Sequence, residues 1–173
     1  MQKFACTFGS GFDMDNKLVI EKFYSAFAVA DADTMLSCYH KEIEFEDPAF
    51  GKLKGDSVQE MWRMLIERGK GAIKISYSDV IADENTGIAN WVAEYKFGPQ
   101  ARPVINRITA HFEFKDGKMI KHTDHFDVWK WAGQAIGWMG YALGWSNFLK
   151  QKIQLNSNNL LQAYIAKKKK LFE

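Results

Sequence analysis

The chain has few of the residues that stabilise small secreted domains or hold metal ions. Only two of its 173 residues are cysteines, and Cys6 and Cys38 lack the spacing of a zinc site or a disulfide framework. The formal net charge of +2 gives no reason to expect a nucleic-acid partner. These features favour a globular protein of a reducing compartment, and we expect it to be cytoplasmic.

Sequence motifs for cofactors are also missing. The chain has no glycine fingerprint after a strand, no phosphate-binding loop and no nucleophile elbow. His122 and His125 do not suggest a metal site, because side chains three residues apart in a strand point to opposite faces and no third ligand has suitable spacing. We therefore expect neither a cofactor nor a metal ion.

Signals for export are missing as well, and the length suits a single folded domain. The N-terminus has no basic region followed by an apolar run, so no signal peptide is predicted. A chain of this length can bury roughly 70% of the surface that it exposes when unfolded. We expect a flexible leader over residues 1–13, a main domain over residues 14–130 and a helical extension over residues 131–173.

Periodicity predicts helices first and strands afterwards. Apolar residues recur at helical spacing after Asp15, Asp33 is expected to cap a short second helix, and Ser57–Glu60 has the pattern of a capping box. Helices followed by an antiparallel meander predict an α+β fold, in which a curved sheet wraps over the helices. The helices are expected near residues 15–30, 33–39 and 57–69, and the strands at residues 43–47, 72–83, 88–97, 104–114 and 118–126.

The first of these strands contains an unexpected acid. In the segment IEFEDPAFG, Asp47 falls on the same side of the strand as Ile43 and Phe45. A carboxylate that faces a core is costly unless it is paired or protonated. Asp47 is therefore either a residue that caps the turn at Pro48 or part of a functional site.

This order of elements, with an E-D-P-x-x-G motif at Glu46–Gly51, resembles the nuclear-transport-factor-2-like superfamily, which includes ketosteroid isomerase and the SnoaL-like cyclases. The resemblance covers roughly Lys17–Trp129 and is most specific over Asp33–Asp47. It implies a cone-shaped α+β roll whose open end is an apolar pocket, and it implies a homodimer. It also implies that Asp47 is a proton-shuttling base.

The resemblance to ketosteroid isomerase is incomplete at two positions. Phe23 and Ala110 stand where that enzyme has the tyrosine and the protonated aspartic acid of its oxyanion hole. Losing one such donor costs about 3–4 kcal/mol of transition-state stabilisation. Steroid isomerisation by that mechanism is therefore not expected.

The last strand supplies further candidate residues. Aligned with the final hairpin of the family, HTDHFD places His122, Asp124 and Phe126 on the cavity side, and Asp124 resembles the acid that SnoaL-like cyclases and limonene epoxide hydrolases use deep in the cone. Asp47, Asp124 and His122 are the predicted catalytic residues, because two nearby carboxylates leave one protonated and one ionised. The alternative is an ion pair of His122 with Asp124 that only closes the interior. The predicted ligand-binding residues are Phe23, Phe27, Trp62, Tyr77, Trp91, Tyr95, Ala110, Phe112 and Phe126.

The C-terminal extension is rich in tryptophan and glycine. Trp131, Trp138 and Trp145 are seven apart, so a continuous helix would place them along one stripe. Such a helix would have to recover the cost of its glycines by packing across the cone mouth or against a dimer partner. Lying in a membrane interface is less favoured, and spanning a bilayer is least favoured. Each glycine costs about 1 kcal/mol relative to alanine, and the four are Gly133, Gly137, Gly140 and Gly144.

Two hypotheses follow for function. In the first, the cavity binds a hydrophobic small molecule, and the protein is a cofactor-independent acid/base isomerase, cyclase or hydrolase of the SnoaL-like type. In the second, the protein binds a ligand or acts as a scaffold without catalysis, with attachment to a membrane surface through the Trp-rich helix as one form. The hypotheses differ in whether the tryptophans fill the cavity or form a rim beside an open one.

Overall fold

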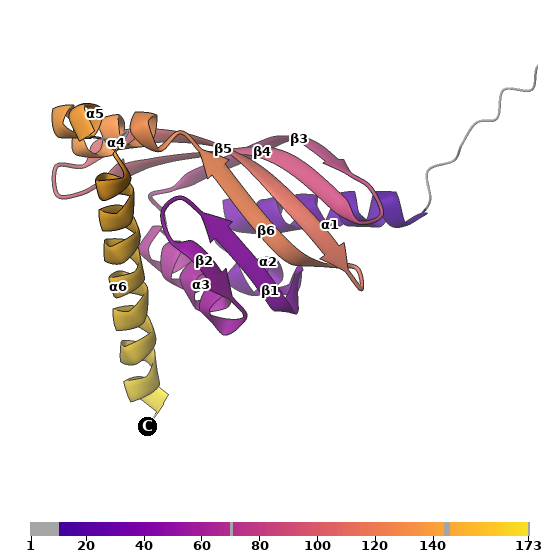
Figure 1. Cartoon of the computed structure of the whole chain (residues 1–173). Coiled ribbons are helices and arrows are strands. Elements are labelled where there is room, and N and C mark those ends of the chain that lie inside the picture. Colours follow the sequence, from indigo (N-terminus) through magenta and orange to yellow (C-terminus); the bar gives the residue numbers. More distant parts are fainter. Residues whose placement is uncertain (1–10, 70, 144–145, 173) are drawn as a thin grey trace, which may run out of the picture.

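The structure, a computed structural model, describes residues 11–69, 71–143 and 146–172 (Figure 1). The leader expected over residues 1–13 lies outside this part of the chain except for its last three residues, which begin the first helix. In chain order the elements are α1 (Gly11–Ala28), α2 (Ala32–Ser37), β1 (Tyr39–Asp47), β2 (Gly51–Lys54), α3 (Asp56–Gly69), β3 (Lys74–Ala82), β4 (Thr86–Phe97), β5 (Arg102–Lys115), β6 (Lys118–Phe126), α4 (Val128–Ile136), α5 (Trp138–Leu143) and α6 (Asn147–Phe172).

The strands form one curved sheet that wraps over α1, α2 and α3, as the sequence predicts for an α+β cone (Figure 1). The strand order is β2-β1-β6-β5-β4-β3, and β3 to β6 form the expected antiparallel meander. Two features were not predicted. β1 joins β6 in parallel, and the short strand β2 pairs back onto β1 after the turn that follows Asp47.

Alternation along the strands decides which residues face the helices. Trp91 and Ala93 on β4, and Ala110 and Phe112 on β5, are buried, while the residues between them point to the other face of the sheet. The inward residues pack against α1, whose Phe23 is fully buried, in a single large apolar core. The burial pattern of both strands therefore follows the two-residue period of a strand.

The second helix begins two residues earlier than the sequence suggests. Its N-cap is Asp31, whose side chain accepts a hydrogen bond from the backbone N–H of Thr34 at 3.0 Å. Asp33, the predicted cap, lies in the first turn and pairs with Arg63 at 2.8 Å. The prediction that Asp33 is the cap is therefore wrong. Asp33 already lies inside the helix, whereas Asp31 precedes it and binds the N–H group of Thr34 in the first turn.

The Trp-rich segment forms two short helices instead of one long helix. α4 ends at Gly137, whose φ of 82° lies in the left-handed region that favours glycine. α5 then turns back onto α4 so closely that a Cβ atom at Gly140 would lie 1.9 Å from the carbonyl oxygen of Ala132. The predicted single stripe is therefore wrong for Trp131 and Trp138, and its third member, Trp145, lies outside the described residues.

The last helix, α6, returns along the main domain. Gln154 and Asn158 donate hydrogen bonds to backbone carbonyls in the turn after β1, and Leu161 is fully buried. Nearer the end of the helix, Lys168 forms an ion pair with Glu60 of α3. Across the described ranges, we find no helix with the length and apolar character needed to cross a bilayer.

Candidate functional site

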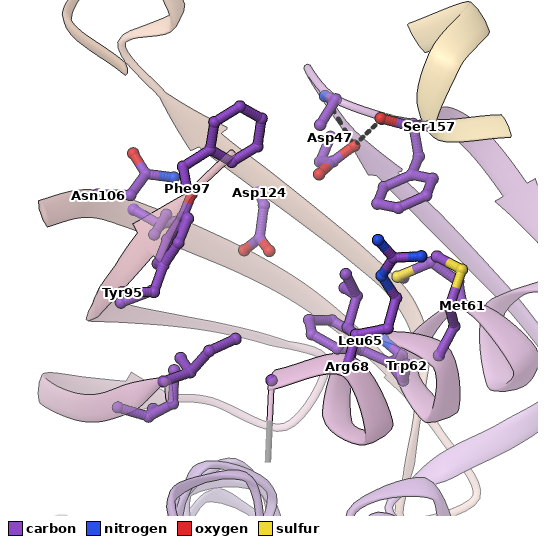
Figure 2. Close-up of a pocket in the computed structure, with 18 of the residues that line it drawn as sticks. Asp47, Met61, Trp62, Leu65, Arg68, Tyr95, Phe97, Asn106, Asp124 and Ser157 are labelled. Carbon is purple, nitrogen blue, oxygen red and sulfur yellow. Dashed lines mark hydrogen bonds between the residues drawn. The ribbon is translucent and has the colours of Figure 1, made fainter. Parts of the chain in front are cut away.

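The concave side of the sheet borders a cavity of about 520 Å³ (Figure 2). Strands β1 and β4 to β6 form its back, α3 forms one side, and α4 and α6 contribute to its rim. Most of the lining is aromatic or aliphatic, as is usual for a small-molecule site. The charged and polar side chains that interrupt it include Asp47, Arg68, Asn106, Asp124 and Ser157.

Strand register brings the two acids of the cavity together. β1 and β6 run parallel, with Phe45 opposite His122 and Glu46 opposite Thr123. One residue further along both strands, Asp47 and Asp124 are neighbours, and both line the cavity. Adjacent strands are about 4.8 Å apart, and Figure 2 shows both acidic side chains in the same pocket.

Asp124 is held by two N–H donors. Its side chain is buried, and its Oδ1 accepts hydrogen bonds from Trp91 Nε1 at 3.1 Å and from His122 Nε2 at 3.0 Å. Two such donors suit an ionised carboxylate, which only accepts hydrogen bonds. Among the described residues none binds Oδ2, so this oxygen is available to a molecule in the cavity.

Behind Asp124, a chain of hydrogen bonds runs through His122 to a buried tyrosine. His122 is fully buried among aromatic rings, with the Phe112 ring centroid 4.5 Å away, and it is not part of the cavity wall. Its Nδ1 lies 2.6 Å from the hydroxyl of Tyr39, and burial, reinforced by the charge of Asp124, raises the pKa of Tyr39 well above its usual value. The Tyr39 hydroxyl therefore stays protonated, and we assign it as the hydrogen-bond donor to Nδ1 of His122. In this tautomer the proton of His122 is on Nε2, which donates a hydrogen bond to Asp124.

Asp47 both caps a turn and faces the cavity. Its Oδ1 accepts hydrogen bonds from the backbone N–H groups of Ala49 and Phe50, so it does cap the turn at Pro48. It also faces the cavity, where burial raises its pKa to about 7 despite these donors, with a further contribution from the charge of Asp124. A carboxyl group with this pKa is partly protonated at neutral pH.

The predicted ligand-binding residues divide into two groups. Phe27, Trp62, Trp91, Tyr95 and Phe126 line the cavity. The other four lie outside its lining. Phe23, Ala110 and Phe112 are buried in the core behind it, and Tyr77 contacts Ser25 of α1 through a hydrogen bond of 2.9 Å.

The sequence interpretation missed several polar residues of the cavity. Asn106 follows the same alternation as Val104 and Ile108, so the strand pattern was sufficient to place it inward. Arg68 and Ser157 come from α3 and α6, and Figure 2 shows Ser157 and Asp47 pointing toward each other. No local signal marks these two residues, since only the packing of the helices brings them to the cavity.

The tryptophans leave the cavity open. Trp131 on α4 is part of its wall, where its Nε1 donates to the hydroxyl of Tyr95 at 2.8 Å and its ring contacts Phe97 at a centroid distance of 5.3 Å. Trp138 is 78% exposed and lies outside the cavity lining. Among the described residues, the Trp-rich segment therefore forms a rim and does not fill the space beside Asp47 and Asp124.

Solved structures with the same fold are numerous but distant in sequence. A candidate polyketide cyclase from Xanthomonas campestris pv. campestris is 16% identical, with a TM-score of 0.59 over 72% of this chain and 98% of that chain. An LEH-like epoxide hydrolase from M. tuberculosis is 20% identical, with a TM-score of 0.57 over 76% and 95%. TerC, co-crystallised with polyporic acid, is 18% identical, with a TM-score of 0.57 over 65% and 92%.

At the level of sequence, no curated protein matches the chain significantly. A family model described as the SnoaL-like domain does match, over residues 20–122, which is more than half of the chain. The matched segment contains α2 and β1 to β5, and it ends within β6 at His122. These solved structures share the fold of this chain, and the family model shows that the chain belongs to the SnoaL-like domain family.

Proposed function

We propose that the cavity binds a hydrophobic small molecule and that Asp124 and Asp47 transfer protons on it as base and acid. The reaction is a cofactor-independent isomerisation, cyclisation or hydrolysis. One observation carries this proposal: a single apolar cavity contains two neighbouring carboxyl groups whose surroundings differ. Such a difference separates the acid from the base in enzymes that use paired carboxyl groups.

The two carboxyl groups have complementary roles in this mechanism. Asp124 presents Oδ2 to the ligand while Trp91 and His122 hold Oδ1, so Oδ2 takes a proton from a C–H next to a carbonyl or from an attacking water. Asp47, with a pKa of about 7, returns a proton to the oxygen or carbon that becomes negative. His122 touches no ligand in this arrangement and is a positioning residue.

The names of two structural neighbours are consistent with this chemistry. One is a candidate polyketide cyclase and another is an LEH-like epoxide hydrolase. Their identity to this chain is too low to transfer a substrate. The proposal therefore rests on the cavity and its acids.

Proton exchange tests the proposal without knowledge of the natural substrate. We expect the protein to incorporate deuterium from D₂O into at least one member of a panel of enolisable hydrophobic ketones, or to hydrolyse a hydrophobic epoxide, as followed by NMR. Asp124→Asn should slow this reaction by about 10²–10⁴-fold. Asp116→Asn is the matched control, because Asp116 is exposed in the hairpin turn before Gly117, where asparagine is equally suitable.

The result also distinguishes the non-catalytic alternative. Quenching of the fluorescence of Trp91 and Trp131 reports a ligand in the cavity, whether or not it reacts. Binding without exchange or hydrolysis by the unmodified protein would contradict the catalytic part and support a binding or scaffolding role. Equal rates for the unmodified protein and Asp124→Asn would remove Asp124 from the mechanism.

A further inference from the structure

The C-terminal segment carries an exposed apolar surface that the proposed function does not use. Figure 1 shows α4, α5 and the beginning of α6 together at one end of the molecule. Five large apolar side chains in this region are each between 47% and 78% exposed. We name this surface the aromatic patch, and its members are Trp129, Trp138, Met139, Tyr141 and Phe148.

The aromatic patch belongs to a packed pair of helices. Trp129 Nε1 donates to the backbone carbonyl of Tyr141 at 2.8 Å, and the two rings meet edge to face at 5.8 Å. Gly133 lies directly beneath the Tyr141 ring, where an added Cβ would approach within 2.4 Å. The exposed side chains on α4 and α5 are therefore held in place by close packing, and their exposure is a property of the folded helices.

The helices that carry the patch are rich in positive charge, although Asp127, the N-cap of α4, is an exposed acid. From Val128 to Phe172 the sequence contains seven lysines and no aspartate or glutamate. Lys130, Lys150 and Lys152 are exposed close to patch residues in the chain, and within the described ranges none of them has an ion-pair partner. Lysines elsewhere on the surface are often paired, as Lys52 is with Glu46 and Lys74 with Glu94.

We propose that the aromatic patch docks onto an anionic lipid surface. Tryptophan and tyrosine favour the boundary between headgroups and acyl chains, and neighbouring lysines interact with lipid phosphates. A second copy of the chain suits this surface less well. A two-fold interface through the patch would bring together the lysines of both copies, which outnumber the acids of this segment.

The aromatic patch lies next to the cavity, so docking would bring the cavity close to the lipid surface. α4 carries Trp129 in the patch and Trp131 in the cavity wall, so one short helix borders both surfaces. A hydrophobic molecule dissolved in the bilayer would reach the cavity without crossing much water. This consequence rests on the proposed function, whereas docking itself does not.

Sedimentation with vesicles tests docking in the full chain. We expect the protein to bind vesicles that contain phosphatidylglycerol about tenfold or more tightly than vesicles of phosphatidylcholine alone, and added salt should weaken this binding. The double variant Trp138→Ala, Phe148→Ala should lose most of the binding. Its control is Val29→Ala, Ile81→Ala, which removes side chains of similar exposure from the turn after α1 and from β3 and should change little.

A second pair of variants tests the charge. Lys130→Gln, Lys150→Gln, Lys152→Gln should weaken binding to phosphatidylglycerol vesicles about tenfold or more. The control Lys52→Gln, Lys74→Gln, Lys121→Gln removes the same total charge from lysines that are paired with glutamates. Circular dichroism of each variant confirms that it is folded.

Three results would overturn the proposal. The unmodified protein could remain in the supernatant with both kinds of vesicle, or each control could lose as much binding as its patch variant. Light scattering could instead reveal a dimer that Trp138→Ala, Phe148→Ala dissociates, together with no binding to vesicles. That last result would assign the patch to contact between copies. None of these measurements uses enzymatic activity, so they are independent of the test for proton transfer.

Discussion

At the scale of single residues, two buried tyrosines beside the site differ in one respect. The hydroxyl of Tyr39 is bonded to His122, whereas the hydroxyl of Tyr24 has no hydrogen-bond partner among the described residues. Both side chains are almost completely buried, and burial raises the pKa of both. Comparing the two tyrosines therefore distinguishes two contributions to the free energy of unfolding. One comes from a buried hydrogen bond, and the other from burying a hydroxyl group that has no partner.

We expect Tyr39→Phe to lower the free energy of unfolding by about 1–3 kcal/mol, because it leaves Nδ1 of His122 buried without a donor. Tyr24→Phe removes a hydroxyl that has no partner, so it should be neutral or slightly stabilising. Urea denaturation of both variants and the unmodified protein measures the two values. Equal losses in the two variants would mean that the Tyr39–His122 hydrogen bond contributes nothing specific.

The two acids and His122 could be predicted from sequence, but the contact of His122 with Tyr39 could not. Alternation placed Asp47 on an inward face, which needs only a period of two, and the resemblance to the family's final hairpin placed Asp124 there. Tyr39 was expected in the second helix and in fact begins β1, 83 residues from the histidine that it contacts. A contact over that separation depends on the parallel pairing of β1 with β6, which no local pattern indicates.

At the scale of secondary-structure elements, Gly140 tests how α4 and α5 pack. Helix propensity alone predicts that Gly140→Ala stabilises α5 by about 1 kcal/mol. The structure predicts the opposite sign, because the new Cβ would lie 1.9 Å from the carbonyl oxygen of Ala132, and backbone atoms cannot move aside cheaply. We expect a loss of about 1–3 kcal/mol in the free energy of unfolding.

Thermal or urea denaturation of Gly140→Ala measures this change. Fluorescence provides a second observable, since displacement of α5 would break the hydrogen bond from Trp129 to the Tyr141 carbonyl and move the Trp129 ring. A stabilised variant with an unchanged spectrum would show that α5 does not pack on α4 as described.

The elements also show why periodicity predicted the fold well and its C-terminal part poorly. The strands β3 to β6 are long enough for alternation to identify them, whereas β2 has four residues and little pattern. The seven-residue spacing of Trp131 and Trp138 suggested one helix because spacing carries no information on backbone direction. The break at Gly137 was visible only as one of several glycines, each with the same expected cost.

At the scale of the whole molecule, the family and the α+β cone followed from the order of elements and the E-D-P-x-x-G motif, and both are now confirmed. The homodimer and the boundaries of the C-terminal extension stay predictions. Those properties depend on surfaces that contact other molecules or on tertiary packing. A motif in one strand does not encode them.

Stability of the whole chain should depend on pH through Asp47. Its pKa is about 7 when folded, against 3.8 in the reference state, so the folded protein binds a proton more tightly than the unfolded chain. The stabilisation is complete below about pH 4 and is lost as pH rises through about 7, because over this range the unfolded chain releases a proton that the folded chain retains. Asp47→Asn, which cannot ionise, should lack this loss and still offer an acceptor to the turn.

The difference in the free energy of unfolding between Asp47→Asn and the unmodified protein isolates this effect, since all other ionisable groups are shared. We expect the difference to shift in favour of Asp47→Asn by about 2–3 kcal/mol between about pH 5 and pH 8. Urea denaturation at the two pH values measures it. A difference that does not vary with pH would mean that water solvates the Asp47 carboxylate fully, and Asp47 would then be unsuited to act as the acid at neutral pH.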